Sequence, residues 1–152
     1  MISKYQSDGY PIFIGTQLNH PREITKEAQR ACKLLTDAGF ILYNQAVLLR
    51  GINDNEEVLE ELFKKLICFK IRPYYLYHCM PSVGTKHLRT TIRKGIDIMR
   101  KLQGKISGLA VPQYTIASKE GGKIPVPYRE IEFFDEKIKT VNYEGKEITY
   151  YE

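Results

Sequence analysis

One lysine in a run bounded by glycines and prolines is the residue of this chain best suited to chemistry. The run reads Glu120-Gly121-Gly122-Lys123-Ile124-Pro125-Val126-Pro127. Glycines let a backbone approach a ligand closely, and prolines stiffen the exit from the run. A lysine delivered at such a fixed point suits a Schiff base to a carbonyl cofactor. A simple surface turn is the alternative interpretation.

The cysteines and histidines are too scattered to predict a metal site made by this chain alone. They are Cys32, Cys68, Cys79, His20, His78 and His87. None of the cysteines forms a CxxC or CxxxCxxC motif, and an odd, dispersed set does not predict a disulfide framework. The histidines also lack the spacing of metal ligands.

Bulk properties indicate an ordinary globular protein. The chain has 152 residues, a length that predicts a single domain-sized unit, and its net charge is +5. Its first residues are polar and no apolar run approaches about 18 residues, so we expect no secretory signal, no membrane span and a cytoplasmic location. The basic segment 86–105 could contact phosphate, although a solvated helix face is the usual meaning of such a pattern and no nucleic-acid module is recognisable.

The elements that must position the lysine alternate along the first two thirds of the chain. Strands are expected at 10–18, 40–49, 72–79 and 108–117, with helices at 25–38, 56–69 and 85–102. Each crossover has room for a helix, which predicts parallel strands with right-handed connections. The strands are apolar enough to predict that both faces of the sheet are covered.

The last part of the chain has a different pattern. Three short segments, 128–134, 137–143 and 146–151, are typical of antiparallel strands. We therefore expect an α/β unit at 1–127, including the lysine loop, and a β extension at 128–152.

Polar residues follow the predicted parallel strands at their C-terminal ends. They are Gln17-Leu18-Asn19-His20, Asn53-Asp54 and His78-Cys79-Met80. This end of a parallel α/β sheet is where ligands bind, and Lys123 could reach the same rim. Three or four β/α units are few for a free-standing sheet, so the sequence predicts the later part of a larger barrel.

Six segments in the same order resemble the C-terminal part of the lysine 2,3-aminomutase family. These segments are 16–25 (TQLNHPREIT), 44–54 (NQAVLLRGIND), 72–79 (RPYYLYHC), 87–96 (HLRT through KGI), 107–112 (SGLAVP) and 121–125 (GGKIP). The resemblance covers roughly residues 10–152.

This resemblance implies a partial (β/α) radical SAM barrel. Its members carry a [4Fe-4S] cluster, S-adenosylmethionine and pyridoxal 5′-phosphate, and they convert an L-α-amino acid into a β-amino acid. The cofactors supply the chemistry, and the protein orients them.

Site residues follow from the resemblance position by position. Lys123 matches the lysine that binds pyridoxal phosphate. Gln17 and Gln45 match positions near the adenosyl group. Tyr75 and Tyr77 are candidates for the wall of the cofactor pocket, although packing is the alternative because aromatic residues favour strands.

The chain departs from the family in ways that bear on activity. The CxxxCxxC motif is absent, so neither the cluster nor S-adenosylmethionine chemistry is expected without a missing N-terminal half. Met80 and Ala117 stand where two carboxylates would hold the distal ammonium of lysine, so they predict a different, apolar substrate or a decayed site. Asn55 stands where some members place a zinc cysteine, and no metal is assigned.

Several interpretations stay open. The chain could be a split subunit, an excised piece or a truncated product. Its expected partners are an amino-acid substrate and either a cluster-bearing half or further copies of itself, with no nucleic acid and no membrane. The alternative function is a non-catalytic remnant or interaction module of the same family.

Overall fold

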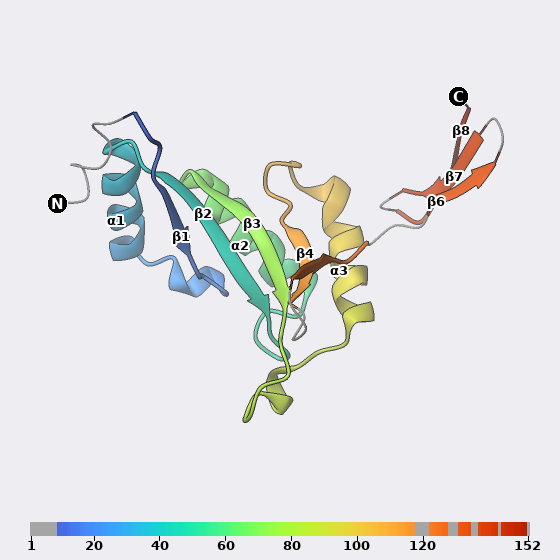
Figure 1. Cartoon of the computed structure of the whole chain (residues 1–152), viewed down its shortest axis with the longest axis horizontal. Helices are drawn as coiled ribbons and strands as arrows, with labels where there is room; N and C mark the ends of the chain where they lie inside the picture. The colour runs from blue at the N-terminus through green and yellow to red at the C-terminus, as the bar shows by residue number, and fades with distance from the viewer. Residues whose placement is uncertain (1–8, 118–121, 128–130, 135–136, 143, 152) are drawn as a thin grey trace.

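The computed structural model describes residues 9–117, 122–127, 131–134, 137–142 and 144–151. Its main body is a five-stranded sheet whose strands follow one another in chain order (Figure 1). The strands are β1 (Phe13–Thr16), β2 (Ile41–Leu48), β3 (Ile71–His78), β4 (Gln113–Ala117) and β5 (Lys123–Pro125). The helices are α1 (Lys26–Asp37), α2 (Glu56–Cys68) and α3 (Ile92–Lys105), with short 3-10 helices η2 (Pro21–Glu23) and η3 (Lys86–Leu88).

The first four strands are parallel, as the sequence predicts, whereas β5 runs antiparallel to β4. Parallel strands in chain order with crossovers of one hand place all their helices on one face. Figure 1 shows α1, α2 and α3 together behind the sheet. The prediction that both faces are covered is therefore wrong for the described part of the chain.

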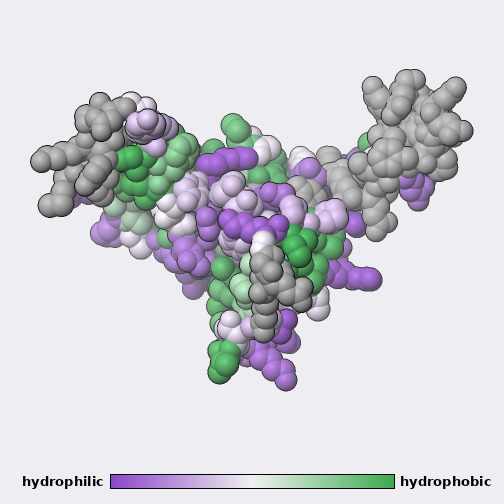
Figure 2. Space-filling model, viewed as in Figure 1, coloured by the Kyte–Doolittle hydropathy of each residue, from purple (hydrophilic) through white to green (hydrophobic). Residues whose placement is uncertain are grey.

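Burial along β2 records this one-sided cover. Leu42, Asn44, Ala46 and Leu48 are buried toward the helices, and the residues between them are only partly buried or exposed. We call the other side of the sheet the open face, and among its residues are Tyr43, Gln45, Val47, Tyr75 and Tyr77. In the same view, Figure 2 shows hydrophobic surface toward the β1 end and more polar surface over the middle of the sheet.

The hydrophobic core lies between the sheet and the helices. Its fully buried side chains include Leu42, Leu48, Leu59, Leu62, Phe63, Leu66, Leu76, Met99, Leu102 and Tyr114. Each buried side chain of this size contributes about 1.5–3 kcal/mol relative to exposure. The core therefore holds the helices firmly against one face of the sheet.

Helix boundaries follow local signals in the sequence. Thr25 accepts a hydrogen bond from the Ala28 N–H at 3.2 Å, and Asn55 accepts one from the Val58 N–H at 2.9 Å, so both are N-caps. Gly39 ends the first helix with a φ of 84°. The helices expected at 25–38 and 56–69 are thus confirmed.

Two predicted elements are shorter or divided. The helix expected at 85–102 is split into η3 and α3, because Thr91 caps a new helix by accepting from the Lys94 N–H. The strand expected at 108–117 begins only at Gln113, after a turn closed by the Ala110 N–H on the Ser107 carbonyl at 2.7 Å. The first strand likewise covers only Phe13–Thr16.

A second sheet contains β6 (Ile131–Phe134), β7 (Lys137–Val141) and β8 (Glu147–Tyr151). Its strands are antiparallel, as predicted, and it lies apart from the main sheet in Figure 1. Gly145, with a φ of 82°, forms the turn between β7 and β8. The turn expected at Asp135-Glu136 lies outside the described residues. Among the described residues, the helices are too short or too polar to span a lipid bilayer.

Candidate functional site

Lys123 is the first residue of a short strand, whereas the sequence predicts a loop at this position. Strand β5 pairs with β4 through Ala117 opposite Lys123 and Thr115 opposite Pro125. Gly122 turns the chain just before it, with a φ of 86° that suits glycine. Pro125 fixes its own φ and restricts the residue before it to extended conformations, which is compatible with its pairing to β4. Residues 118–121 lie outside the described part.

Two tyrosines of β3 lie beside the amino group of Lys123. Its Nζ atom lies 4.7 Å from the centre of the Tyr75 ring and 6.0 Å from that of Tyr77. The two ring centres are 5.2 Å apart. Tyr75 and Tyr77 are two positions apart on one strand, so they share a face. The structure thus brings three predicted site residues together on the open face.

The aromatic surface extends beyond the predicted residues because β3 contains a bulge. Gln45 pairs with Tyr75 while Asn44 pairs with Pro73, so Tyr74 is an extra residue in the strand. The ring of Tyr74 lies 4.0 Å from that of Tyr75, and Tyr43 packs edge-on against Tyr74 at 5.5 Å. Sequence reasoning missed Tyr74 and Tyr43. Pro73 within a strand pattern was the available signal, because proline in a sheet favours bulges and edges.

The two predicted glutamines occupy neighbouring positions across β1 and β2. Gln45 lies on the open face and is the direct strand partner of Tyr75. Gln17 follows Thr16, whose strand partner is Asn44. Buried Asn44 fixes the chain after β1 by accepting from the Leu18 N–H at 2.8 Å and donating to the Leu18 carbonyl at 2.9 Å. Gln17 is therefore held at the end of β1 nearest to Gln45.

The two residues predicted to contact substrate are placed differently. Ala117 is the strand partner of Lys123, and side chains opposite each other in an antiparallel ladder lie on the same face. Met80 lies in the loop beyond β3 and is 39% exposed. Its carbonyl accepts a hydrogen bond from the Thr85 hydroxyl at 3.2 Å. Ala117 thus borders Lys123 directly, whereas Met80 lies three residues beyond Tyr77.

The tyrosines favour the charged form of the lysine. A hydrogen bond to Tyr77 raises the pKa of Lys123 above its ordinary value and outweighs the opposing effect of desolvation, and electrostatic interactions with the three tyrosines add to the rise. The pKa of Tyr74 is raised as well, first by its hydrogen bond to Tyr75. The amino group of Lys123 is exposed, so a carbonyl compound can reach it.

Polar residues that the sequence placed at the ligand-binding rim are instead bonded within the protein. Asn53 is fully buried, and its side chain accepts from the Leu49 N–H at 2.6 Å. It also donates to the carbonyls of Asn19 and Val47, both at 2.8 Å. Asn53 therefore ties the loop after β1 to the loop after β2, and its hydrogen bonds are used inside the protein.

Asp54 is also a structural residue. Its carboxylate accepts from the Gly51 N–H at 2.8 Å and from Lys94 Nζ at 2.7 Å. Burial alone would raise the pKa of Asp54, but hydrogen bonds from Lys94, the Gly51 N–H and Thr90 outweigh it and lower the pKa. This ion pair links the start of α2 to α3.

His78 faces the helices and not the open face. Its Nδ1 lies 2.7 Å from the hydroxyl oxygen of Tyr114 in the interior. Burial and then the charge of Arg89 lower the pKa of His78, so its imidazole is neutral near pH 7. A Cβ atom at Gly95 of α3 would overlap the Tyr114 hydroxyl, so glycine is required at that position.

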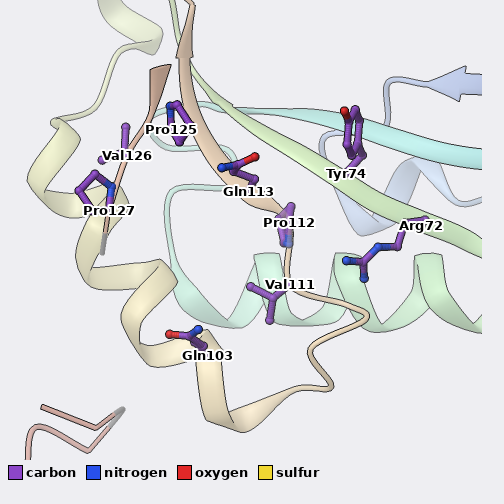
Figure 3. A pocket seen from close by; sticks show the side chains of 9 residues that line it. All are labelled: Arg72, Tyr74, Gln103, Val111, Pro112, Gln113, Pro125, Val126 and Pro127. Carbon is purple, nitrogen blue, oxygen red and sulfur yellow. The ribbon is translucent and has the colours of Figure 1, made fainter. Parts of the chain in front are cut away.

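A depression of about 640 Å³ lies at the far end of β5 from Lys123 (Figure 3). Its lining residues are Arg72, Tyr74, Gln103, Val111, Pro112, Gln113, Pro125, Val126 and Pro127. Lys123 is not among them, and they include no amine, thiol, imidazole or carboxylate. We therefore place the candidate site at Lys123. Within the described ranges, no three His, Cys, Asp or Glu residues are grouped so as to hold a metal ion.

Comparison with known proteins identifies relatives over the whole chain. No family model matches the sequence. The L-lysine 2,3-aminomutase of Clostridium subterminale is 46% identical over 154 residues, covering 100% of this chain and 36% of the relative. The corresponding enzyme of Fusobacterium nucleatum is 45% identical over 154 residues, covering 100% of this chain and 35% of the relative.

A relative with a different substrate in its name is almost as similar. The glutamate 2,3-aminomutase of Clostridioides difficile is 44% identical over 127 residues, covering 83% of this chain and 29% of the relative. The chain spans about a third of the length of the curated lysine aminomutases it matches. With matches along its whole length, the chain belongs to the lysine 2,3-aminomutase family and corresponds to the C-terminal part of its members.

Proposed function

We propose that this chain is the pyridoxal-phosphate-binding portion of an amino-acid 2,3-aminomutase, an isomerase that moves an amino group between adjacent carbons. The observation that carries the proposal is the position of Lys123 Nζ, exposed and 4.7 Å from the ring centre of Tyr75. An amine at that point can attack a carbonyl carbon, and flat aromatic surface lies beside it. Homologues named for lysine and glutamate aminomutation support the same reaction class.

The arrangement of the sheet supports a partial (β/α) barrel. Strands in chain order with all helices on one side are typical of a barrel, whereas an open doubly wound sheet reverses its strand order and covers both faces. In a barrel, the open face becomes the interior. Lys123, Tyr75, Tyr77 and Gln45 would then all point inward. We propose that residues 1–127 form this part of the barrel and that 128–152 form an extension.

The residues present fit pyridoxal phosphate. Lys123 offers an amino group for covalent attachment, and the rings of Tyr75 and Tyr77 offer faces for a pyridine ring. When bound, the cofactor would supply a conjugated system that acts as an electron sink. The chain itself positions the amine, through the pairing of Lys123 with Ala117, and lines one side of the site with aromatic surface.

Catalysis requires groups that this chain does not bring. A [4Fe-4S] cluster needs cysteine thiolates, and the three cysteines of the chain are widely separated in sequence. We propose that an N-terminal portion carrying the cluster completes the enzyme. Gln17 and Gln45 would then lie beside the adenosyl group of S-adenosylmethionine. Without that portion, the chain should bind pyridoxal phosphate and not isomerise amino acids.

The test is spectroscopic and uses the chain as it is. Purified protein is mixed with pyridoxal phosphate, and the long-wavelength absorption band of the lysine-linked cofactor is recorded, then fixed by borohydride and located by peptide mass spectrometry. We expect the label on Lys123 and its loss in Lys123→Ala, while Lys26→Ala, at an exposed lysine on α1, retains it. A band that survives Lys123→Ala, or no band in the parent chain, would favour a non-catalytic remnant of the family.

We also propose that the substrate side chain is uncharged. Ala117 borders Lys123, and Met80 lies just beyond β3, and neither can neutralise a charged group. An unpaired charge held in a dry site is costly. Titrating the cofactor-loaded chain with leucine, lysine and glutamate should displace the Lys123 linkage at the lowest concentration with leucine. Equal or stronger displacement by lysine would overturn this assignment.

A further inference from the structure

The amino group of Lys123 is held before any ligand arrives. Its Nζ atom lies 4.7 Å from the ring centre of Tyr75 and 6.0 Å from that of Tyr77. The two rings are inclined at 38° to each other, with centres 5.2 Å apart, so they form a shallow aromatic corner. We call this pair of rings the tyrosine corner.

The ring contacts and a hydrogen bond to Tyr77 both favour an ammonium over a neutral amine. A cation within about 6 Å of a tyrosine ring centre is attracted to the ring face. A hydrogen bond between Lys123 and Tyr77 adds to this attraction and raises the pKa of Lys123. Attack on a carbonyl requires the neutral amine, because the ammonium has no free electron pair. The contacts that position the lysine therefore also restrain its reactivity.

We propose that Tyr75 and Tyr77 are positioning residues that clamp the Lys123 ammonium against their rings in the resting protein. A planar ligand that takes the same ring faces displaces the ammonium and frees the amine to react, with its proton passing to water. In this arrangement, the same two ring faces hold the lysine in the resting protein and contact the flat ligand when it binds. The link to cofactor attachment rests on the function proposed above, whereas the clamp itself does not.

Among the described residues around Lys123, few other groups can titrate. Strand β3 contributes Tyr74, Tyr75 and Tyr77, which are the groups that raise the lysine pKa. Strand β4 places Ala117 beside it, and across the sheet Gln45 pairs with Tyr75. Among the described residues, the groups that shift the pKa of Lys123 include no carboxylate. Removal of the tyrosine contacts should therefore lower the pKa of Lys123 directly.

The experiment measures how fast Lys123 reacts with limiting trinitrobenzenesulfonate as pH is varied, read by peptide mass spectrometry. The rate at Lys26 in the same sample serves as an internal reference. Tyr77→Phe keeps the ring and removes the hydrogen-bonding oxygen, whereas Tyr75→Leu removes the nearer ring. We expect the rate–pH profile of Lys123 to move to lower pH in each variant. Tyr10→Phe, at a tyrosine that is 77% exposed, should leave it unchanged.

Each result decides the proposal. A Lys123 profile that matches the parent chain in both variants, with the Lys26 rate and the circular dichroism spectrum preserved, overturns it. If one variant unfolds, the other supplies the answer, because each removes a different contact. A shifted profile together with no pyridoxal phosphate linkage would keep the clamp and reject the proposed function. An unshifted profile with a normal linkage would do the reverse.

Discussion

The hydroxyl oxygen of Tyr114 lies 2.7 Å from Nδ1 of His78, and this buried contact joins β4 to β3 on the side of the sheet that faces the helices. Directly behind it, α3 approaches so closely that only glycine fits at position 95. His78 immediately follows Tyr77, so the contact anchors the end of the strand whose other face bears the tyrosine corner.

The close approach at Gly95 predicts a destabilising substitution. Alanine favours helices over glycine by about 1 kcal/mol. Overlap with the Tyr114 ring opposes this gain, and overpacking of a core costs about 1–3 kcal/mol. We therefore expect Gly95→Ala to lower the free energy of unfolding in urea. Gly108→Ala is the matched control, because a Cβ there meets nothing within 4 Å. Unchanged stability in Gly95→Ala would contradict the tight packing.

The two asparagines at positions 53 and 55 should respond very differently to the same isosteric change. In Asn53→Asp, a carboxylate oxygen would replace the amide that donates to Asn19 and Val47, leaving a buried charge against two carbonyls. A loss of about 3–5 kcal/mol is expected near pH 7. Asn55→Asp keeps an acceptor for the Val58 N–H and adds a negative charge at a helix N-terminus, so its stability should change little.

Urea denaturation of the two variants tests this pair. The loss in Asn53→Asp should diminish in acid, because protonation removes the buried charge. An equal effect of the two substitutions would show that Asn53 is not the internal link between the loops.

His78 predicts a dependence of stability on pH. Burial and Arg89 keep the folded-state pKa of His78 below the ordinary value of 6.5. The unfolded chain thus binds this proton more readily, and stability should fall as pH drops below about 6.5. His78→Asn retains an acceptor for Tyr114 and does not titrate. Urea unfolding at about pH 7.5 and about pH 5.5 should show a greater loss in the parent chain than in this variant, and equal losses would contradict the assignment.

Gly122 predicts a local effect on the candidate site. Its φ of 86° strains any other residue, although a Cβ there would meet nothing within 4 Å. Gly122→Ala should cost roughly 1–2 kcal/mol and should also weaken attachment of pyridoxal phosphate to Lys123. Gly145→Ala carries the same strain, at a φ of 82°, in the second sheet. It should lose similar stability and keep the attachment, as a titration with pyridoxal phosphate would show.

Local signals in the sequence were enough to predict most of the parallel part of the fold. Thr25 and Asn55 mark helix starts because a side-chain oxygen there can satisfy a backbone N–H three residues on. The sequence predicts a loop at Lys123, because a three-residue strand is too short to show a periodic pattern. The strand exists because β4 is there to pair with it, which no local pattern records.

Long-range polar contacts were the least predictable feature. His78 and Tyr114 are 36 positions apart, and no local sequence pattern around either residue predicts their contact. Asn53 was expected to face a ligand because polar residues at strand ends often do, but its side chain is used to join two loops. The family resemblance, rather than periodicity, predicted that Tyr75, Tyr77 and Lys123 belong to one site.

The pairing of Lys123 with Ala117 has a consequence for how such chains diverge. Side chains alternate along a strand, so a slip of one residue between β5 and β4 would turn the lysine toward the helices. The loss of a single codon within β5 could thus silence the site while leaving length, charge and composition almost unaltered. Codons gained or lost between the two strands would be tolerated as long as this one pairing survived. The face on which the Lys123 side chain lies therefore depends on the register of a three-residue strand.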